Sequence, residues 1–368
     1  MVPLSGSPGW IEQGLNLAIL AALILPFGAY MADVFRNRKT ALSFVLDPLE
    51  RAALQLAGVK AEHSMDWRTY ALSALSFSSL VFLVLYVALA GNGLVADRAF
   101  ALAAVLAADP GAATTAPAAA ATVAAFVSAG TGLAVFMAMV RGLSGLRVGN
   151  FWADLVRAEL RVVLPLSLAF AALVATAGAG EALEAFGRAH VVDHAPQLPS
   201  IAGEAAALVA TPSGAVVNAA AVPTAAAPSS RLLSLLSHAL IPLALSHSFG
   251  LMTGDRRQGA LILGATALVL VTGHAAGPAM SCGLVAAFML TAAVIGRLRT
   301  GQAVYLGRRL GRYEVSMAVA CLGLIVIAPL TSLAPALSLI ALPARLWTLI
   351  PALAFAGSLS TQASGAQV

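Results

Sequence analysis

The stretch Met252-Thr253-Gly254-Asp255-Arg256-Arg257-Gln258-Gly259 joins two apolar runs, 232–252 and 258–275. Each run approaches the roughly 20 residues that a helix needs to cross about 30 Å of hydrocarbon. A short glycine-containing turn with two arginines indicates a hairpin of two membrane helices whose turn faces the cytoplasm. The same stretch is also typical of an ordinary helix end followed by a turn, which requires no function.

Three other basic segments, 34–69, 141–161 and 296–314, also lie between apolar runs. Together with 253–259 they carry 17 of the 21 Lys and Arg residues. Because these residues concentrate in cytoplasmic loops, we expect all four segments on that side. The remaining segments hold eight of the 16 acids and only four arginines, so they should face outward or lie within the bilayer.

Composition defines the class of protein. The chain is 60% hydrophobic and 10% charged, with a mean hydropathy of +0.90, whereas soluble domains carry about 25% charged residues. The sequence therefore indicates an integral membrane protein. The pI near 9.7 is explained by basic loops beside apolar runs, without a nucleic-acid partner. Cys282 and Cys321 lie in or beside apolar segments, which indicates neither a disulfide framework nor a zinc site.

The apolar runs predict about nine transmembrane helices. They lie near 15–33, 70–91, 120–140, 160–178, 232–252, 258–275, 283–297, 315–335 and 337–357. The first run follows Glu12 and precedes a basic flank, so we expect a retained helix with its N-terminus outside rather than a cleavable signal.

The order of the segments indicates an internal repeat. After the first helix, a unit of span, outside segment, span and basic loop recurs four times, which predicts an all-α polytopic protein with four pseudo-repeats of helix, re-entrant segment and helix. Irregular backbone at membrane depth is tolerated where it lines a cavity. The expected divisions are an N-terminal helix with its cytoplasmic loop at 1–69, pseudo-repeats at 70–141, 142–252, 253–297 (truncated) and 298–360 (truncated), and a tail at 361–368.

Two small-residue turns are candidates for an ion filter, because small residues let backbone carbonyls point at an ion. The first lies within 211–218 and the second at 281–283. The candidate residues are Thr211, Ser213, Gly214, Asn218, Ser281, Cys282 and Gly283. The alternatives are an ordinary loop for the first turn and a helix N-terminus, capped by its serine, for the second. Arg345 falls inside the last apolar stretch, where a cation either serves a pore or gating function or snorkels to the interface.

Catalytic motifs are not evident in the sequence. It contains no HExxH, Walker A loop or phosphorylation-type aspartate signature. His238 and His247 lie nine residues apart and point from opposite faces of a helix. His190, Asp193 and His194 leave open a metal-dependent intramembrane enzyme as the third hypothesis.

Motifs along most of the chain resemble one family, the potassium-binding A subunit of the bacterial Kdp potassium-transporting P-type ATPase (the KdpA family). The matching stretches are Leu49-Glu50-Arg51, Gly58-Val59, Met65–Tyr70, Phe126–Gly132, Gly149–Arg157, Met252–Gly259, Ile295–Arg297, Tyr305–Arg309, Ile350-Pro351 and Ala356–Leu359.

This resemblance implies a potassium-channel-like fold, in which the re-entrant segments of the four pseudo-repeats are pore segments. Their filter would pass a potassium ion to a separate ATP-hydrolysing B-type subunit, with small C- and F-type subunits as further partners. This chain would then be the non-catalytic subunit, in the bacterial inner membrane. Thr211, Gly214 and Asn218 match the second filter loop, Ser281–Gly283 the third, and Arg345 an arginine below the filter.

The departures from the family fall at the filter. The first loop is replaced by Ala107–Ala112, the second has lost two of three glycines, and the fourth loop and the final helix have no counterpart. A dehydrated potassium ion needs carbonyls from four loops. We therefore expect a potassium-binding and translocating subunit with a degenerate filter. The alternative is a non-transporting scaffold or assembly paralogue that keeps the fold and the partner surfaces.

Overall fold

The computed structural model describes residues 10–40, 42–91, 99, 118–170, 172, 228–271, 278–331 and 350–359. The elements are α1 (Trp10–Phe35), α2 (Ser43–Leu56), α3 (Trp67–Gly91), α5 (Ala118–Leu143), α6 (Phe151–Arg157), η2 (Ala158–Val163), α9 (Pro228–Thr253), α10 (Arg256–Val271), α11 (Pro278–Thr300), β1 (Val304–Tyr305), β2 (Arg308–Arg309) and α12 (Arg312–Thr331). A further short helix covers Ile350–Leu359. The described chain is thus almost entirely helical.

Four helices in the described ranges are long and apolar enough to cross a membrane. They contain the spans Gln13–Phe35, Trp67–Gly91, Phe126–Leu143 and Met280–Thr300. Shorter apolar helices lie at Ala239–Thr253 and Ile350–Leu359. The expectation of a helical membrane protein is confirmed at this level. A described helix overlaps each of the nine apolar runs, but nine crossings and four pore repeats remain predictions, because most of the proposed pore segments lie outside the described residues.

Two segments that were predicted from the sequence to be cytoplasmic loops contain regular structure. In 34–69, α2 buries Leu46, Glu50 and Leu54, which recur every four residues and therefore share one helix face. In 296–314, β1 and β2 form an antiparallel hairpin. Its turn has positive φ angles at Leu306 and Gly307, as in the tight turns that match the twist of two strands.

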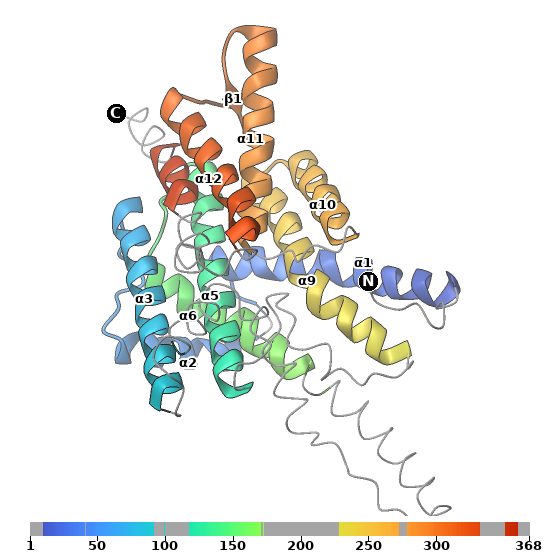
Figure 1. Ribbon diagram of the computed structural model, residues 1–368, viewed down its shortest axis with the longest axis vertical. Coiled ribbons are helices and arrows are strands. Elements are labelled where there is room, and N and C mark those ends of the chain that lie inside the picture. The colour runs from blue at the N-terminus through green and yellow to red at the C-terminus, as the bar shows by residue number, and fades with distance from the viewer. Residues whose placement is uncertain are drawn as a thin grey trace, which may run out of the picture.

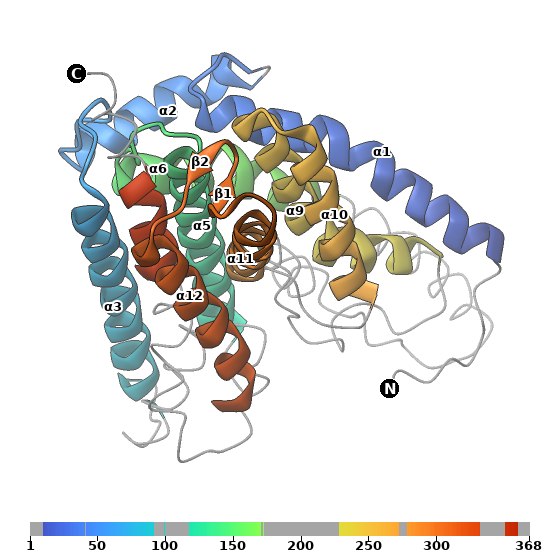
Figure 2. The same cartoon turned by 90° about the horizontal axis from the view of Figure 1, so that it is seen from above.

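The helices form two groups that meet at α11. In Figure 2, α3, α12 and α5 lie on one side, α9, α10 and α1 lie on the other, and α11 is seen nearly end-on between them. In Figure 1, α1 runs across the direction of α3 and α5. The main packing pairs are α1 with α9, α9 with α10, and α11 with α12.

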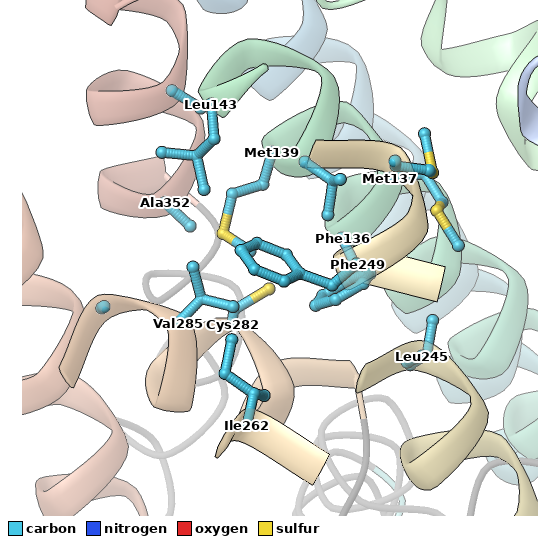
Figure 3. Close-up of a cluster of buried hydrophobic side chains, with 14 of the residues drawn as sticks. Phe136, Met137, Met139, Leu143, Leu245, Phe249, Ile262, Cys282, Val285 and Ala352 are labelled. Carbon is cyan, nitrogen blue, oxygen red and sulfur yellow. The ribbon is translucent and has the colours of Figure 1, made fainter. Parts of the chain in front are cut away.

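The largest apolar cluster lies where these groups meet. Phe136 and Met139 of α5, Phe249 of α9, Ile262 of α10 and Val285 of α11 are all fully or almost fully buried in it. Figure 3 shows these side chains converging from their separate helices. Because such a cluster draws on helices far apart in sequence, it holds the two groups together.

The α9–α10 hairpin has the backbone contact that its glycines permit. Gly254 has a φ of 79° in the turn, a conformation that glycine adopts without strain. Above the turn, a Cβ on Gly259 would lie 2.6 Å from the Cα of Gly250. The two helices therefore approach more closely than any pair of side chains would allow.

We predict that Gly259→Ala destabilises the hairpin by about 1–3 kcal/mol, because the added methyl group must push two backbones apart. Gly264→Ala is the matched control, since it lies in the same helix and nothing stands within 4 Å of its position for a Cβ. Thermal unfolding in detergent should show a lower midpoint for Gly259→Ala and an unchanged or higher one for Gly264→Ala. Equal midpoints would contradict the close contact.

Candidate ion site and buried charge network

The predicted filter residues fall mostly outside the described part of the chain. Thr211, Ser213, Gly214, Asn218 and Arg345 all lie there, so their roles remain predictions. The same holds for the proposed metal ligands His190, Asp193 and His194. Among the described residues, no group of three or more His, Cys, Asp and Glu side chains could hold a metal ion.

Ser281, Cys282 and Gly283 lie in the first turns of α11, which begins at Pro278. Ser281 and Cys282 are buried, and Cys282 lies in the apolar cluster near Val285 and Phe249 (Figure 3). The described backbone here is helical, as the alternative of a helix N-terminus predicts. A helix uses its early carbonyls for its own hydrogen bonds, so coordination of a cation by these carbonyls would require the turns to unwind.

A buried ion pair lies at the predicted cytoplasmic end of α5. Arg141 of α5 contacts Asp154 of α6, and their side chains are 12% and 1% exposed. The Tyr70 hydroxyl of α3 lies 3.0 Å from Oδ2 of Asp154 and 3.0 Å from the carbonyl oxygen of Ala134. Its single hydrogen donates to one of these acceptors at a time. Three helices are therefore joined at one carboxylate.

A second set of buried charges joins α2 to the helix that begins with α6. Arg157 Nε donates to Glu50 Oε1 at 2.8 Å, and Arg161 pairs with Glu50 and with Asp47, the latter at 2.8 Å. The Tyr30 hydroxyl of α1 donates to the backbone carbonyl of Arg161 at 2.6 Å. Glu50 and Asp47 together thus compensate two arginines that would be strongly destabilising if they were buried alone.

Asn150 fixes the start of this helix and the loop beside it. Its side-chain oxygen accepts a hydrogen bond from the Trp152 N–H, which is an N-cap. Its Nδ2 donates to the carbonyl of His63 at 3.2 Å, and the Met65 N–H donates to the carbonyl of Gly149 at 2.7 Å. Segments 34–69 and 141–161, two of the predicted cytoplasmic segments, are therefore bound to each other.

This network has a structural rather than a catalytic character, because each charge in it has an opposite charge within contact. From the sequence, we interpreted its arginines only as markers of topology, and their pairing with acids was missed. The available signal was the acidic residues Asp47, Glu50 and Asp154 inside basic segments. Each of these acids pairs with an arginine at least 13 residues away in the sequence. The spacing of residues along one helix therefore could not identify the pairs.

These features define the class of the protein as a polytopic helical membrane protein with buried, compensated charges at its predicted cytoplasmic ends. The profile of the family described as "Potassium-transporting ATPase A subunit" matches residues 14–103 and 107–289. The chain belongs to this family. The matched ranges include both candidate filter turns and the buried network, and they end before Tyr305 and Arg345.

Curated relatives agree with this assignment. A potassium-transporting ATPase potassium-binding subunit from Sorangium cellulosum is 36% identical over 298 residues, covering 70% of this chain and 51% of that protein. Proteins with the same description from Allorhizobium ampelinum and Chromobacterium violaceum are 33% and 31% identical, covering 73% and 72% of this chain and 52% and 54% of theirs. The chain spans about half the length of the curated relatives it matches.

We predict that Asp154→Asn destabilises the chain by about 3–5 kcal/mol, since it leaves the Arg141 guanidinium buried without a counter-charge. Tyr70→Phe keeps the ion pair and should cost less, about 1–3 kcal/mol, for the lost hydroxyl contact. Thermal unfolding of the purified variants should rank the midpoints as wild type, then Tyr70→Phe, then Asp154→Asn. The reverse order of the two variants would contradict the role given to the ion pair.

Proposed function

We propose that this chain is the potassium-binding and translocating membrane subunit of an ATP-driven potassium uptake complex. The observation that carries the proposal is the family match over 14–103 and 107–289, which includes Thr211–Asn218 and Ser281–Gly283. The curated relatives are named as potassium-binding subunits of a potassium-transporting ATPase. Potassium is accordingly the ligand proposed for the candidate filter.

The partners follow from the same proposal. Family resemblance points to an ATP-hydrolysing B-type subunit and small C- and F-type subunits, and this chain would contribute no ATP-hydrolysing site. The buried network supports this role, because it orders 34–69 and 141–161 against each other. An ordered cytoplasmic surface is what a partner subunit requires for docking without a large entropic cost.

A non-transporting scaffold is the second candidate function. It is favoured by the helical conformation of Ser281–Gly283 and by the loss of two glycines in the second filter turn and of the fourth loop. A filter made from fewer loops replaces less of the hydration shell of potassium. Binding of the ion distinguishes the two functions.

We predict that potassium raises the thermal unfolding midpoint of the purified chain in detergent, compared with sodium at the same ionic strength. A ligand at 100 times its dissociation constant stabilises the folded state by about 2.7 kcal/mol. A rise that is specific for potassium supports the transport subunit. Identical midpoints up to high millimolar salt would leave the scaffold as the function of this chain.

We also predict a multi-pass topology in the bacterial inner membrane, with the N-terminus outside and the basic segments in the cytoplasm. Both native cysteines are buried, so a single cysteine introduced at an exposed position can report which side of the membrane that position faces. Glu62→Cys should react with a membrane-impermeant maleimide only after cells are permeabilised, whereas Asp193→Cys should react in intact cells. Labelling of Glu62→Cys in intact cells would show the opposite orientation.

A further inference from the structure

Helix α2 has a second apolar face, which is exposed. Its first face is buried against α6 and η2. The second face consists of Phe44, Val45, Leu49 and Leu56, whose exposed fractions are 92%, 57%, 49% and 93%. Because consecutive residues of a helix are about 100° apart, these four side chains fall within an arc of about 140°. They form the outer face of α2, and an apolar face this exposed indicates an interaction surface.

A polar strip borders the outer face of α2. It consists of Asp47, Arg51 and Gln55, which recur every four residues. The helix therefore has three sides: one packed on protein, one polar, and one apolar and exposed. This division is typical of a helix that lies in the plane of a membrane surface, with its polar side toward water and its apolar side in the boundary between headgroups and acyl chains.

The position of α2 agrees with the surface of a bilayer. Membrane spans adjoin it in the chain on both sides, since one span ends at Phe35 and the next begins at Trp67. Trp152 lies in the first turn of α6, on which α2 packs, and tryptophan is enriched at membrane–water interfaces. In Figure 2, α2 lies at the edge of the molecule and runs across the direction of α3, as a helix parallel to the bilayer plane would.

The charge around the outer face is mainly positive. Segment 36–68 contains six Lys and Arg residues and four acids. Two of these acids, Asp47 and Glu50, are already paired with arginines of the helix that begins with α6. Lys39, Arg51 and Lys60 are exposed before, within and after α2. Anionic lipids attract basic residues beside membrane helices, so a lipid surface supplies both the apolar layer and the negative charge that this face requires.

We propose that the outer face of α2 binds the surface of an anionic lipid leaflet on the predicted cytoplasmic side. The four apolar side chains enter the boundary between headgroups and acyl chains, and Lys39, Arg51 and Lys60 contact lipid phosphates. Lipid then holds α2 on one side while the buried charge network holds it on the other. This surface is separate from the candidate ion filter and does not depend on the ion that the chain binds.

Single nitroxide labels on the full-length chain in vesicles test this surface. Both native cysteines are buried, so labels can be attached to Phe44→Cys and Leu56→Cys on the outer face, and to Gln55→Cys on the polar strip as the matched control. Each label meets molecular oxygen, which concentrates in the acyl layer, and a water-soluble nickel chelate present on both sides of the vesicle membrane. In vesicles of phosphatidylcholine and phosphatidylglycerol, the ratio of oxygen to nickel relaxation should be several-fold higher at positions 44 and 56 than at position 55.

Vesicles of phosphatidylcholine alone test the part played by lipid charge. The ratio at position 56 should be lower in these vesicles than in those with phosphatidylglycerol. Adding Arg51→Gln and Lys60→Gln to the labelled chain should remove the difference between the two lipids. An equal ratio in both lipids before these substitutions would overturn the preference for an anionic surface.

Two other results would overturn the proposal as a whole. If labels at positions 44 and 56 relax with the nickel chelate as fast as the label at position 55, the outer face lies in water and is free for a partner protein. If these labels are shielded from both reagents, the face is packed against protein, such as a second copy of this chain. Neither result bears on the proposed potassium function, because neither involves ion binding.

Discussion

The structure depends on the neutralisation of buried charge where helices meet. Glu50 alone contacts two arginines of the helix that begins with α6, and Asp154 joins Arg141 to Tyr70. Buried pairs of this kind add little stability compared with apolar packing, but removal of one partner is strongly destabilising. We therefore infer that the pairs act mainly as a constraint on register, since a shift of α2, α3, α5 or α6 would separate charges that compensate each other in this arrangement.

Much of the helical architecture could be predicted from the sequence, because a run of apolar residues long enough to cross a bilayer has few alternatives to a helix. The regular structure within the predicted loops, α2 and the β1–β2 hairpin, could not be predicted in this way. The apolar face of α2 contains Glu50, whose burial makes sense only beside Arg157 and Arg161. The β1–β2 hairpin depends on a turn at Leu306-Gly307. This turn lies in a short, strongly basic segment whose residues do not alternate between apolar and polar as those of a strand usually do.

The candidate site was predicted less completely. Resemblance to the family located Ser281–Gly283, and the structure puts these residues in a helix rather than in an open turn. Their residue types suit both conformations, since serine caps helices and glycine permits turns.

Direct equilibrium binding of potassium to the purified chain tests the account most directly. The account predicts saturable binding that a large excess of sodium does not displace, in a preparation whose cooperative unfolding shows that it is folded. Folded protein without saturable potassium binding would contradict it, and the chain would then be a member of the family that keeps the helices and the buried network without the ion.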